Sequence, residues 1–225
     1  MKDSQQFELR LPSDFSLEAG RWYDTPDKVE RDERMAKVTK AYVKENGCLN
    51  AELFMQLARW KSPRLTGRAA RNTEQEIEEM TRMALSAKTE RCRIACLTGL
   101  EGVGWPMASV ILHFCHRDRY PILDVRALGT LGVKTKPAYN LDFWVAYIGF
   151  CRDKAKQYKA SMRSFDRALW GYSYHGALIR CVISWVFLNA VPAVCLVSIA
   201  PHSAMCRLPS LTPSACAANK SRYKF

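Results

Sequence analysis

The sequence has few of the features that mark secreted or β-rich proteins. Alternation of apolar and polar residues, which is typical of a half-buried strand, is confined to a weak stretch from Phe7 to Leu11. The first residues, Met-Lys-Asp-Ser-Gln-Gln, contain no apolar signal-peptide core. Nine cysteines are an odd number, and in a chain of this length they fit reduced thiols better than a disulfide framework. These absences predict an intracellular protein, cytoplasmic or nuclear, with little or no sheet.

Acidic residues are also scarce, and none follows Asp166. The chain has 34 Lys and Arg residues against 22 Asp and Glu residues, which gives a net charge of +12. An excess of this size suits a polyanionic partner, and nucleic acid is the first candidate. Because many basic proteins bind no nucleic acid, charge alone does not decide the function.

The last part of the chain, residues 175–225, differs in kind from what precedes it. Cys181 to Ala200 contains no charged residue, and that length is about the 20 residues that a membrane-spanning helix needs. Asn189 and Pro192 interrupt this stretch, however, and neither flank resembles an anchor. A membrane segment, a packed hydrophobic helix and an adventitious tail all remain open. We expect no dedicated membrane partner.

Amphipathic helices account for most of the remaining sequence. Thr25-Pro26 is a typical helix start, Gly47 a typical stop, and Thr73 with Glu76 forms a capping box. The charge that follows Pro26 predicts a solvated helix face. The expected helices cover residues 27–46, 50–60, 73–85, 89–97, 106–115, 125–131, 140–151 and 164–172. The pattern predicts an all-α fold in three parts: an N-terminal segment with a charged helix (1–49), a helical domain (50–174) and the atypical tail (175–225).

A short glycine motif separates two of these helices. Residues 100–104 read Leu-Glu-Gly-Val-Gly. Gly102 and Gly104 would permit a tight turn and the close approach of a phosphate to backbone N–H groups, and Val103 would point into the core. The next helix opens directly afterwards, so that its N-terminal N–H groups would face the same place. The motif predicts a hairpin that binds a DNA backbone.

Residues 89–131 resemble the helix-hairpin-helix DNA glycosylase superfamily, the endonuclease-III-like repair enzymes. Leu100, Gly102, Val103, Gly104 and Ala108 match the family's hairpin motif, with Glu101 in place of its proline. Tyr120-Pro121-Ile122-Leu123-Asp124 matches the segment that carries the family's catalytic aspartate. Its Pro-Ile-Leu-Asp sequence is most similar to that of the adenine-mismatch branch. The likeness extends loosely over residues 50–172. It implies a helix-hairpin-helix glycosylase-like domain that acts on double-stranded DNA.

Two departures from the family pattern narrow the chemistry. Bifunctional members carry a lysine two residues after the second hairpin glycine, where it forms a Schiff base with the sugar. This chain has Pro106 there, which excludes lyase chemistry through that position. Some members also hold an iron–sulfur cluster on closely spaced C-terminal cysteines, a spacing that Cys181, Cys195, Cys206 and Cys216 do not reproduce. We therefore expect no cofactor and no iron–sulfur cluster.

Asp124 is the candidate catalytic residue. It lies 20 residues after Gly104, and the resemblance implies that its carboxylate supports base excision. Cleavage of an N-glycosidic bond builds positive charge on the sugar, and a carboxylate beneath the sugar stabilises that charge. An aspartate before Val-Arg-Ala-Leu is also an ordinary N-cap, and this alternative stays open. Arg126 is a candidate partner for Asp124 or for a phosphate.

The remaining candidates are less specific. A flipped base needs a pocket, usually lined by aromatic rings, for which we expect the four side chains Trp60, Trp105, Tyr120 and Trp144. Arg117 and Arg119 are candidate DNA-backbone contacts beside Gly102, Val103, Gly104 and Arg126, and Lys61, Arg64, Arg68 and Arg71 form a further basic stretch. Asp166 and Arg167 are expected to form a surface pair. Metal binding is not expected, because Cys92, Cys96, His113, Cys115 and His116 fit core positions better than ligand positions.

The sequence thus predicts a monofunctional DNA glycosylase that uses Asp124. The main alternative is a non-catalytic DNA-binding module in which the hairpin holds phosphates and Asp124 only caps a helix. A third possibility is a membrane-tethered helical protein whose basic charge faces lipid headgroups. The sequence does not reveal the target base or the oligomeric state.

Overall fold

The computed structural model describes residues 8–22, 25–116, 119–133 and 138–189, with side chains described up to residue 175. Within these residues every regular element is helical and no strand occurs, so the all-α prediction is confirmed. The weak pattern at Phe7 to Leu11 forms no strand in its described part. The elements are η1 (Leu17–Trp22), α1 (Pro26–Asn46), α2 (Ala51–Lys61), η2 (Pro63–Leu65), α3 (Thr66–Ala69), α4 (Glu74–Ser86), α5 (Glu90–Thr98), α6 (Trp105–Cys115), α7 (Val125–Thr130), α8 (Leu141–Gln157) and α9 (Met162–Asn189).

Local capping explains where several helices begin and end. The Asn50 side chain accepts a hydrogen bond from Leu53 N at the start of α2. Thr73 and Glu76 form both hydrogen bonds of the predicted capping box at the start of α4. Gly47 ends α1 in the left-handed conformation with φ of 72°. These ends follow from the side chains at the boundaries, which is why the sequence predicted them within a few residues.

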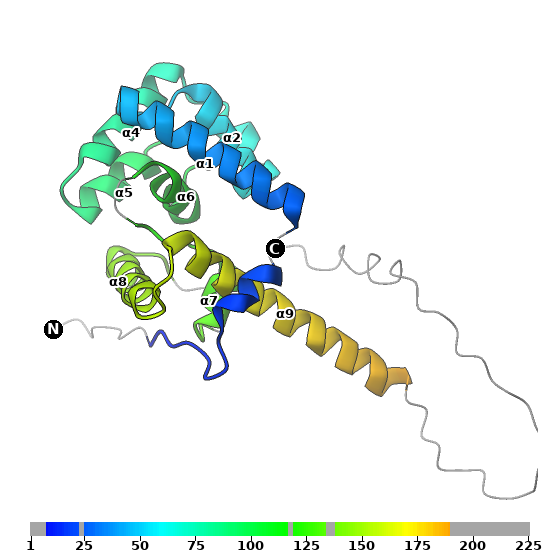
Figure 1. The fold of residues 1–225 in the computed structure, drawn as a ribbon. Helices are drawn as coiled ribbons and strands as arrows, with labels where there is room; N and C mark the ends of the chain where they lie inside the picture. Colours follow the sequence, from blue (N-terminus) through cyan, green and yellow to red (C-terminus); the bar gives the residue numbers. More distant parts are fainter. Residues whose placement is uncertain (1–7, 23–24, 117–118, 134–137, 190–225) are drawn as a thin grey trace, which may run out of the picture. The chain divides into compact units, whose positions relative to one another are not determined.

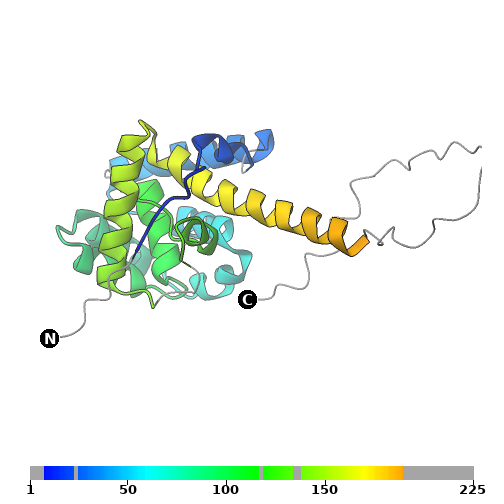
Figure 2. The ribbon, with the colours of Figure 1, turned by 90° about the horizontal axis from the view of Figure 1, so that it is seen from below.

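Helix α6 lies at the centre of the helical packing. Eight of its eleven residues are buried, because the helix is apolar on all sides and contacts α1, α2 and α5. Figure 1 shows α1, α2, α4, α5 and α6 in one group and α7, α8 and the start of α9 in a second. Figure 2 shows the same ribbon from below, with α9 extending away from the other helices. One continuous set of buried side chains, from Phe15 to Leu169, joins the two groups.

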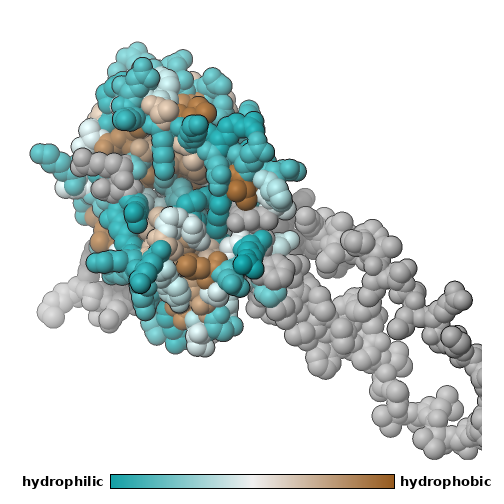
Figure 3. Space-filling view, in the orientation of Figure 1, coloured by the Kyte–Doolittle hydropathy of each residue, from teal (hydrophilic) through white to brown (hydrophobic). Residues whose placement is uncertain are grey.

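The chain divides into two compact units, Met1–Trp185 and Val186–Phe225. The residues of the predicted N-terminal segment and of the predicted helical domain fall in the first unit, where α1 packs on α6. On the face drawn in Figure 3, hydrophilic side chains predominate and hydrophobic ones form separate patches. The second unit contributes only the last residues of α9 to the described structure.

The predicted hydrophobic stretch from Cys181 to Ala200 lies mostly outside the described residues. Its backbone is helical as far as Asn189. In the part of the chain that the structure describes, no helix combines the length and the apolarity that a membrane crossing requires.

Candidate functional site

The Gly-Val-Gly motif forms a turn between α5 and α6, as predicted. Val103 N donates to Leu100 O at 3.1 Å, and Gly102 takes a φ of 78°, which side chains other than glycine rarely adopt. Leu100 and Val103 are both buried, so the turn pins the two helices to the core. A helix, a hairpin and a second helix therefore follow one another here.

The hairpin is fixed against the segment 66–72. A Cβ on Gly102 would lie 3.0 Å from Ala69 N, so the close approach requires glycine. On the outer side, the Asn72 side chain binds the backbone of Glu101 twice: Glu101 N donates to Oδ1 at 2.7 Å, and Nδ2 donates to Glu101 O at 3.0 Å. These contacts hold the turn in one conformation.

Gly104 differs from Gly102, because nothing in the described chain requires glycine at this position. Its backbone has φ −94° and ψ −178°, which any residue can adopt. An added Cβ would meet no atom closer than Pro106 Cδ at 3.8 Å. Gly104 is exposed and is the N-cap of α6, yet no side chain caps that end. Pro106 has no N–H, so Trp105 and Met107 carry the N–H groups of the first turn of α6, and a glycine at the N-cap places no side chain over them.

A second structural feature is the extended segment Ile122–Leu123, which precedes Asp124 and is held from four helices. Ile122 N donates to Asp166 Oδ1 at 2.9 Å, and Ile122 O accepts from the Tyr147 hydroxyl at 2.8 Å. Leu123 N donates to Ser109 Oγ at 2.8 Å, and Leu123 O accepts from Lys61 Nζ at 3.3 Å. Each backbone N–H and C=O of these two residues is therefore satisfied by a side chain. The segment presents the next residue, Asp124, in a defined position.

Asp124 is both a helix cap and one partner of an ion pair. Its Oδ1 accepts from Arg126 N at 2.9 Å, which confirms the predicted N-cap of α7. Its Oδ2 lies 3.0 Å from Lys61 Nζ at the end of α2. The Asp124 side chain is 27% exposed, and that of Lys61 is 14% exposed. The cap and the ion pair thus leave part of the Asp124 side chain exposed, and the catalytic role stays a prediction.

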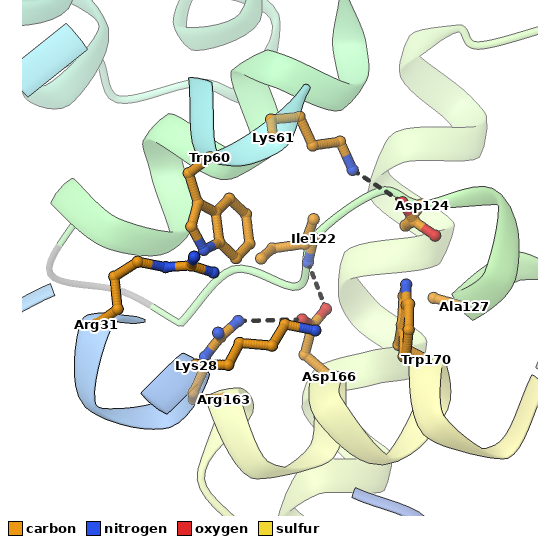
Figure 4. Close-up of a pocket in the computed structure, with 10 residues that line it drawn as sticks. All are labelled: Lys28, Arg31, Trp60, Lys61, Ile122, Asp124, Ala127, Arg163, Asp166 and Trp170. Carbon is orange, nitrogen blue, oxygen red and sulfur yellow. Dashed lines mark hydrogen bonds and ion pairs between the residues drawn. The ribbon is translucent and has the colours of Figure 1, made fainter. Parts of the chain in front are cut away.

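Asp124 lines a cavity of about 200 Å³ whose walls come from α1, α2, α7 and α9. Figure 4 shows Lys61 reaching toward Asp124 from α2, and Trp170 of α9 standing beside Ala127. The remaining lining side chains are Lys28, Arg31, Trp60, Ile122, Arg163 and Asp166. Two carboxylates, two indole rings and four cationic side chains therefore meet in one place.

The buried carboxylate of Asp32, behind the cavity wall, holds the Trp60 ring of that wall in place. Asp32 of α1 is 1% exposed and accepts hydrogen bonds from Trp60 Nε1 and from Arg163 Nη2, both at 2.7 Å. The Arg163 guanidinium in turn lies 5.4 Å from the centre of the Trp60 ring. Helix α1 therefore supplies part of this site. The sequence predicted that its charged residues form a solvated face, and for Asp32 that prediction is wrong.

Asp166 is buried, so the prediction that it belongs to a surface pair is wrong. It is 7% exposed, accepts from Ile122 N and faces Arg163 at 3.7 Å. Burial, and to a smaller extent the Asp124 charge, raise the pKa of Asp166 from 3.8 to about 6, although the charges of Arg163 and Lys61 and the hydrogen bond from Ile122 N act in the opposite direction. A carboxyl group that titrates near pH 6 thus lies in the wall of the cavity.

This pKa predicts a pH dependence of stability. Between about pH 4 and pH 6, Asp166 is protonated in the folded state and ionised in the unfolded state. The protonated Asp166 therefore stabilises the fold below pH 4, and this stabilisation is lost as the pH rises through 6. From pH 4 to pH 7 the free energy of unfolding should fall by ~2 kcal/mol relative to Asp166→Asn. Urea unfolding at both pH values measures this difference. Asp153→Asn, at an exposed position of α8, is the control, and parallel curves for wild type and Asp166→Asn would contradict the assignment.

Of the four aromatic residues predicted for a base pocket, only Trp60 lies at the cavity that contains Asp124. Tyr120 and Trp144 are 1% and 0% exposed and stack on each other at 6.0 Å. Their polar atoms both bind Glu90, the Tyr120 hydroxyl at 2.5 Å and Trp144 Nε1 at 3.0 Å. Trp105 packs on Trp144 at 6.3 Å. These three rings form a structural cluster, of which Tyr120 and Trp144 are bonded to Glu90.

The arginines that were predicted to contact a DNA backbone lie in different surroundings. The Arg126 guanidinium lies over the rings of Trp170 and Tyr174, at 5.2 and 5.4 Å, and only its backbone N–H contacts Asp124. Arg119 is exposed, and its carbonyl oxygen accepts from Arg152. Arg117 lies outside the described residues.

The sequence analysis did not assign most of the residues that line the cavity to the site; three of these are Lys61, Asp166 and Trp170. Helical periodicity could have found two of them. Lys61 follows Phe54 and Leu57 on the inner stripe of α2, and Asp166 lies between Met162 and Leu169 on the buried stripe of α9. A charged residue within an apolar stripe indicates a buried polar contact. No comparable signal distinguishes Trp170 from the other tryptophans.

Among the described residues, no group of three or more His, Cys, Asp or Glu side chains could hold a metal ion. The predicted core positions of Cys115 and His116 are confirmed, since both are buried, whereas Cys92 is exposed. Burial also lowers the pKa of His113 to about 3, with the Arg163 charge acting in the same direction. The C-terminal cysteines considered for a cluster lie outside the residues whose side chains are described.

Comparison of the chain with protein-family models, with curated proteins and with solved structures finds no match in any of the three.

Proposed function

We propose that this protein binds double-stranded DNA through the hairpin and hydrolyses the N-glycosidic bond of a flipped damaged or mismatched base, with Asp124 as the catalytic carboxylate. One observation carries the proposal. Asp124 lines a cavity with Trp60 and Trp170, and its segment is bonded to α6, the helix that begins at the hairpin. The family likeness of residues 89–131 supports the same function.

The DNA-binding part of the proposal rests on the end of α6. Gly104 leaves the N-terminus of this helix accessible, and the helix dipole there favours an anion. Phosphate oxygens are the groups that such sites hold on DNA. The net charge of +12 favours the same partner.

Helix α6 links this phosphate site to the carboxylate. Ser109 lies five residues after Gly104, which is about 7.5 Å along a helix axis. Its hydroxyl donates to Pro106 O at 2.7 Å and accepts from Leu123 N at 2.8 Å, directly before Asp124. A backbone held at the hairpin would therefore have a fixed spatial relation to the carboxylate, as positioning of a reacting sugar requires.

The chemistry assigned to Asp124 is electrostatic. As the base departs, positive charge develops on the sugar, and the carboxylate would stabilise it and orient the attacking water. Lys61 holds the carboxylate in place from the other side. Trp60 and Trp170 would flank the extruded base.

Within the described part of the chain, the amine of Lys61 contacts Asp124, yet its geometry favours hydrolysis. Its Nζ lies 3.0 Å from Asp124 Oδ2 and 3.3 Å from Leu123 O, so it serves as an ion-paired ammonium donor. An ammonium group has no lone pair with which to attack a sugar carbon. The proposal is therefore base release without strand cleavage.

The decisive experiment incubates the full chain with labelled duplexes that each carry one altered or mismatched base. We expect abasic sites on at least one duplex, detected as strand breaks that appear only after alkali. Breaks without alkali would indicate an amine-dependent lyase. Salt-dependent duplex binding with no abasic product on any duplex would support the alternative, a DNA-binding module in which Asp124 only caps α7.

The hairpin has its own test in Gly104→Asp and Gly104→Asn. Both side chains are good N-caps and the backbone accepts them, so both variants should fold with at least wild-type stability. The added carboxylate occupies the proposed phosphate site and repels DNA. We expect Gly104→Asp to bind duplex at least about 10-fold more weakly than Gly104→Asn at low salt. Equal affinity of the two variants would show that DNA does not approach this end of α6.

A further inference from the structure

The charges around the cavity bear on which bases it accepts. Lys28, Arg31, Lys61 and Arg163 line it together with the two carboxylates of Asp124 and Asp166. Cationic side chains therefore outnumber anionic ones, even when the buried Asp32, which pairs with Arg31 and Arg163, is counted. Lys28 and Arg31 are three residues apart on α1 and so lie on the same face of that helix.

The aromatic rings of the cavity already carry cations. Lys28 Nζ lies 4.8 Å from the centre of the Trp170 ring, and Arg126 Cζ lies 5.2 Å from it. Arg163 Cζ lies 5.4 Å from the centre of the Trp60 ring. An aromatic face attracts a cation through its quadrupole, and a side-chain cation at that face repels a second one.

Bases differ in the charge with which they leave. In the hydrolysis of a neutral nucleoside, water adds its oxygen to C1′, the C1′–N bond breaks, and its electron pair goes to the base. The base leaves as an anion and takes up one proton of the water, while the other proton remains on the new C1′ hydroxyl. An N-alkylated base such as 7-methylguanine is cationic in the nucleoside and leaves as a neutral molecule. Nearby cations stabilise a base that leaves as an anion, and they disfavour binding of a base that is cationic in the nucleoside.

We propose that the cavity selects an electrically neutral base that departs as an anion, and that it discriminates against cationic alkylated bases. This inference rests on the proposed function and specifies its substrate class. Arg31 is the residue best suited to test it, because its side chain lines the cavity, is 68% exposed, and meets its carboxylate partner, Asp32 Oδ1, only at 3.8 Å.

The test compares single-turnover base release by the full chain from two sets of duplexes. The neutral set contains uracil, hypoxanthine, 8-oxoguanine, and adenine opposite 8-oxoguanine; the cationic base is 7-methylguanine. We expect release of at least one neutral base at least about 10-fold faster than release of 7-methylguanine. Faster or equal release of 7-methylguanine overturns the inference and leaves the proposed function standing. No release from any duplex overturns the proposed function and this inference with it.

Arg31→Glu then tests whether the cations set the preference. It should lower the ratio of neutral-base to 7-methylguanine release at least about 10-fold, and Arg31→Gln should lower it by less. Lys37→Glu makes the same charge change on an exposed part of α1 that does not line the cavity, and should leave the ratio unchanged. If Arg31→Glu unfolds, Arg31→Gln alone decides. An unchanged ratio in the folded Arg31 variants overturns the inference that the cations of the cavity set the preference.

Discussion

Asp124→Asn is expected to lower the rate of base release at least about 100-fold while duplex binding is retained. Asparagine matches aspartate as an N-cap, so the hydrogen bond from Arg126 N and the start of α7 should persist. The substitution removes only the negative charge, which the proposed mechanism needs opposite the developing positive charge of the sugar. Single-turnover base release and duplex affinity, measured on the same preparation, separate catalysis from capping.

Asp142→Asn provides the matched control. Asp142 is an exposed aspartate in the first turn of α8, so its replacement removes the same charge near a helix start, away from the cavity. This variant should release bases at the wild-type rate. A rate for Asp124→Asn within threefold of wild type would contradict the mechanism and would reduce Asp124 to a helix cap.

Trp144→Ala should produce the largest loss of stability, about 3–5 kcal/mol. Trp144 is the largest of the fully buried side chains and packs on Tyr120, Trp105 and Tyr147. Its removal leaves a cavity and deprives Glu90 of the indole N–H. Because domains of this size are stable by roughly 5–15 kcal/mol, the change would consume much of the total. Urea unfolding followed by circular dichroism measures it.

Trp144→Phe separates the two contributions. It keeps most of the ring volume and removes the N–H donor, so we expect a smaller loss of about 1–3 kcal/mol, and this variant remains measurable if Trp144→Ala does not fold. A loss below 1 kcal/mol for Trp144→Ala would mean that the ring is not a core element, and would return it to the candidates for base binding.

The parts of the structure that depend on neighbouring residues could be predicted from the sequence. Gly47 and Thr73 mark helix ends through contacts within a few residues, and the hairpin follows from Gly102 and its flanking helices. Asp124 as an N-cap belongs to the same class. In each case the physical cause acts over one turn of chain, which a linear pattern records.

The parts that depend on long-range packing could not be predicted. The pairing of Lys61 with Asp124 joins residues 63 positions apart, and the contact of Arg163 with Asp32 joins residues 131 apart. Aromatic residues illustrate the same limit: Trp60, Trp144 and Trp170 are chemically alike in the sequence, and only the fold places the first and third at a cavity and the second in the core. Which helices meet is decided by tertiary packing that no local pattern records.

The way in which the segment before Asp124 is held has a consequence for folding. Its four anchoring hydrogen bonds span sequence separations of 14, 25, 44 and 62 residues. Each of them requires closure of a chain loop whose entropy cost is met only when the helices at its ends have docked. No fragment that lacks α2 or the start of α9 contains all four partners. The carboxylate therefore reaches its position only once the chain from α2 to α9 has assembled, so a partly folded chain would carry the hairpin without a positioned Asp124.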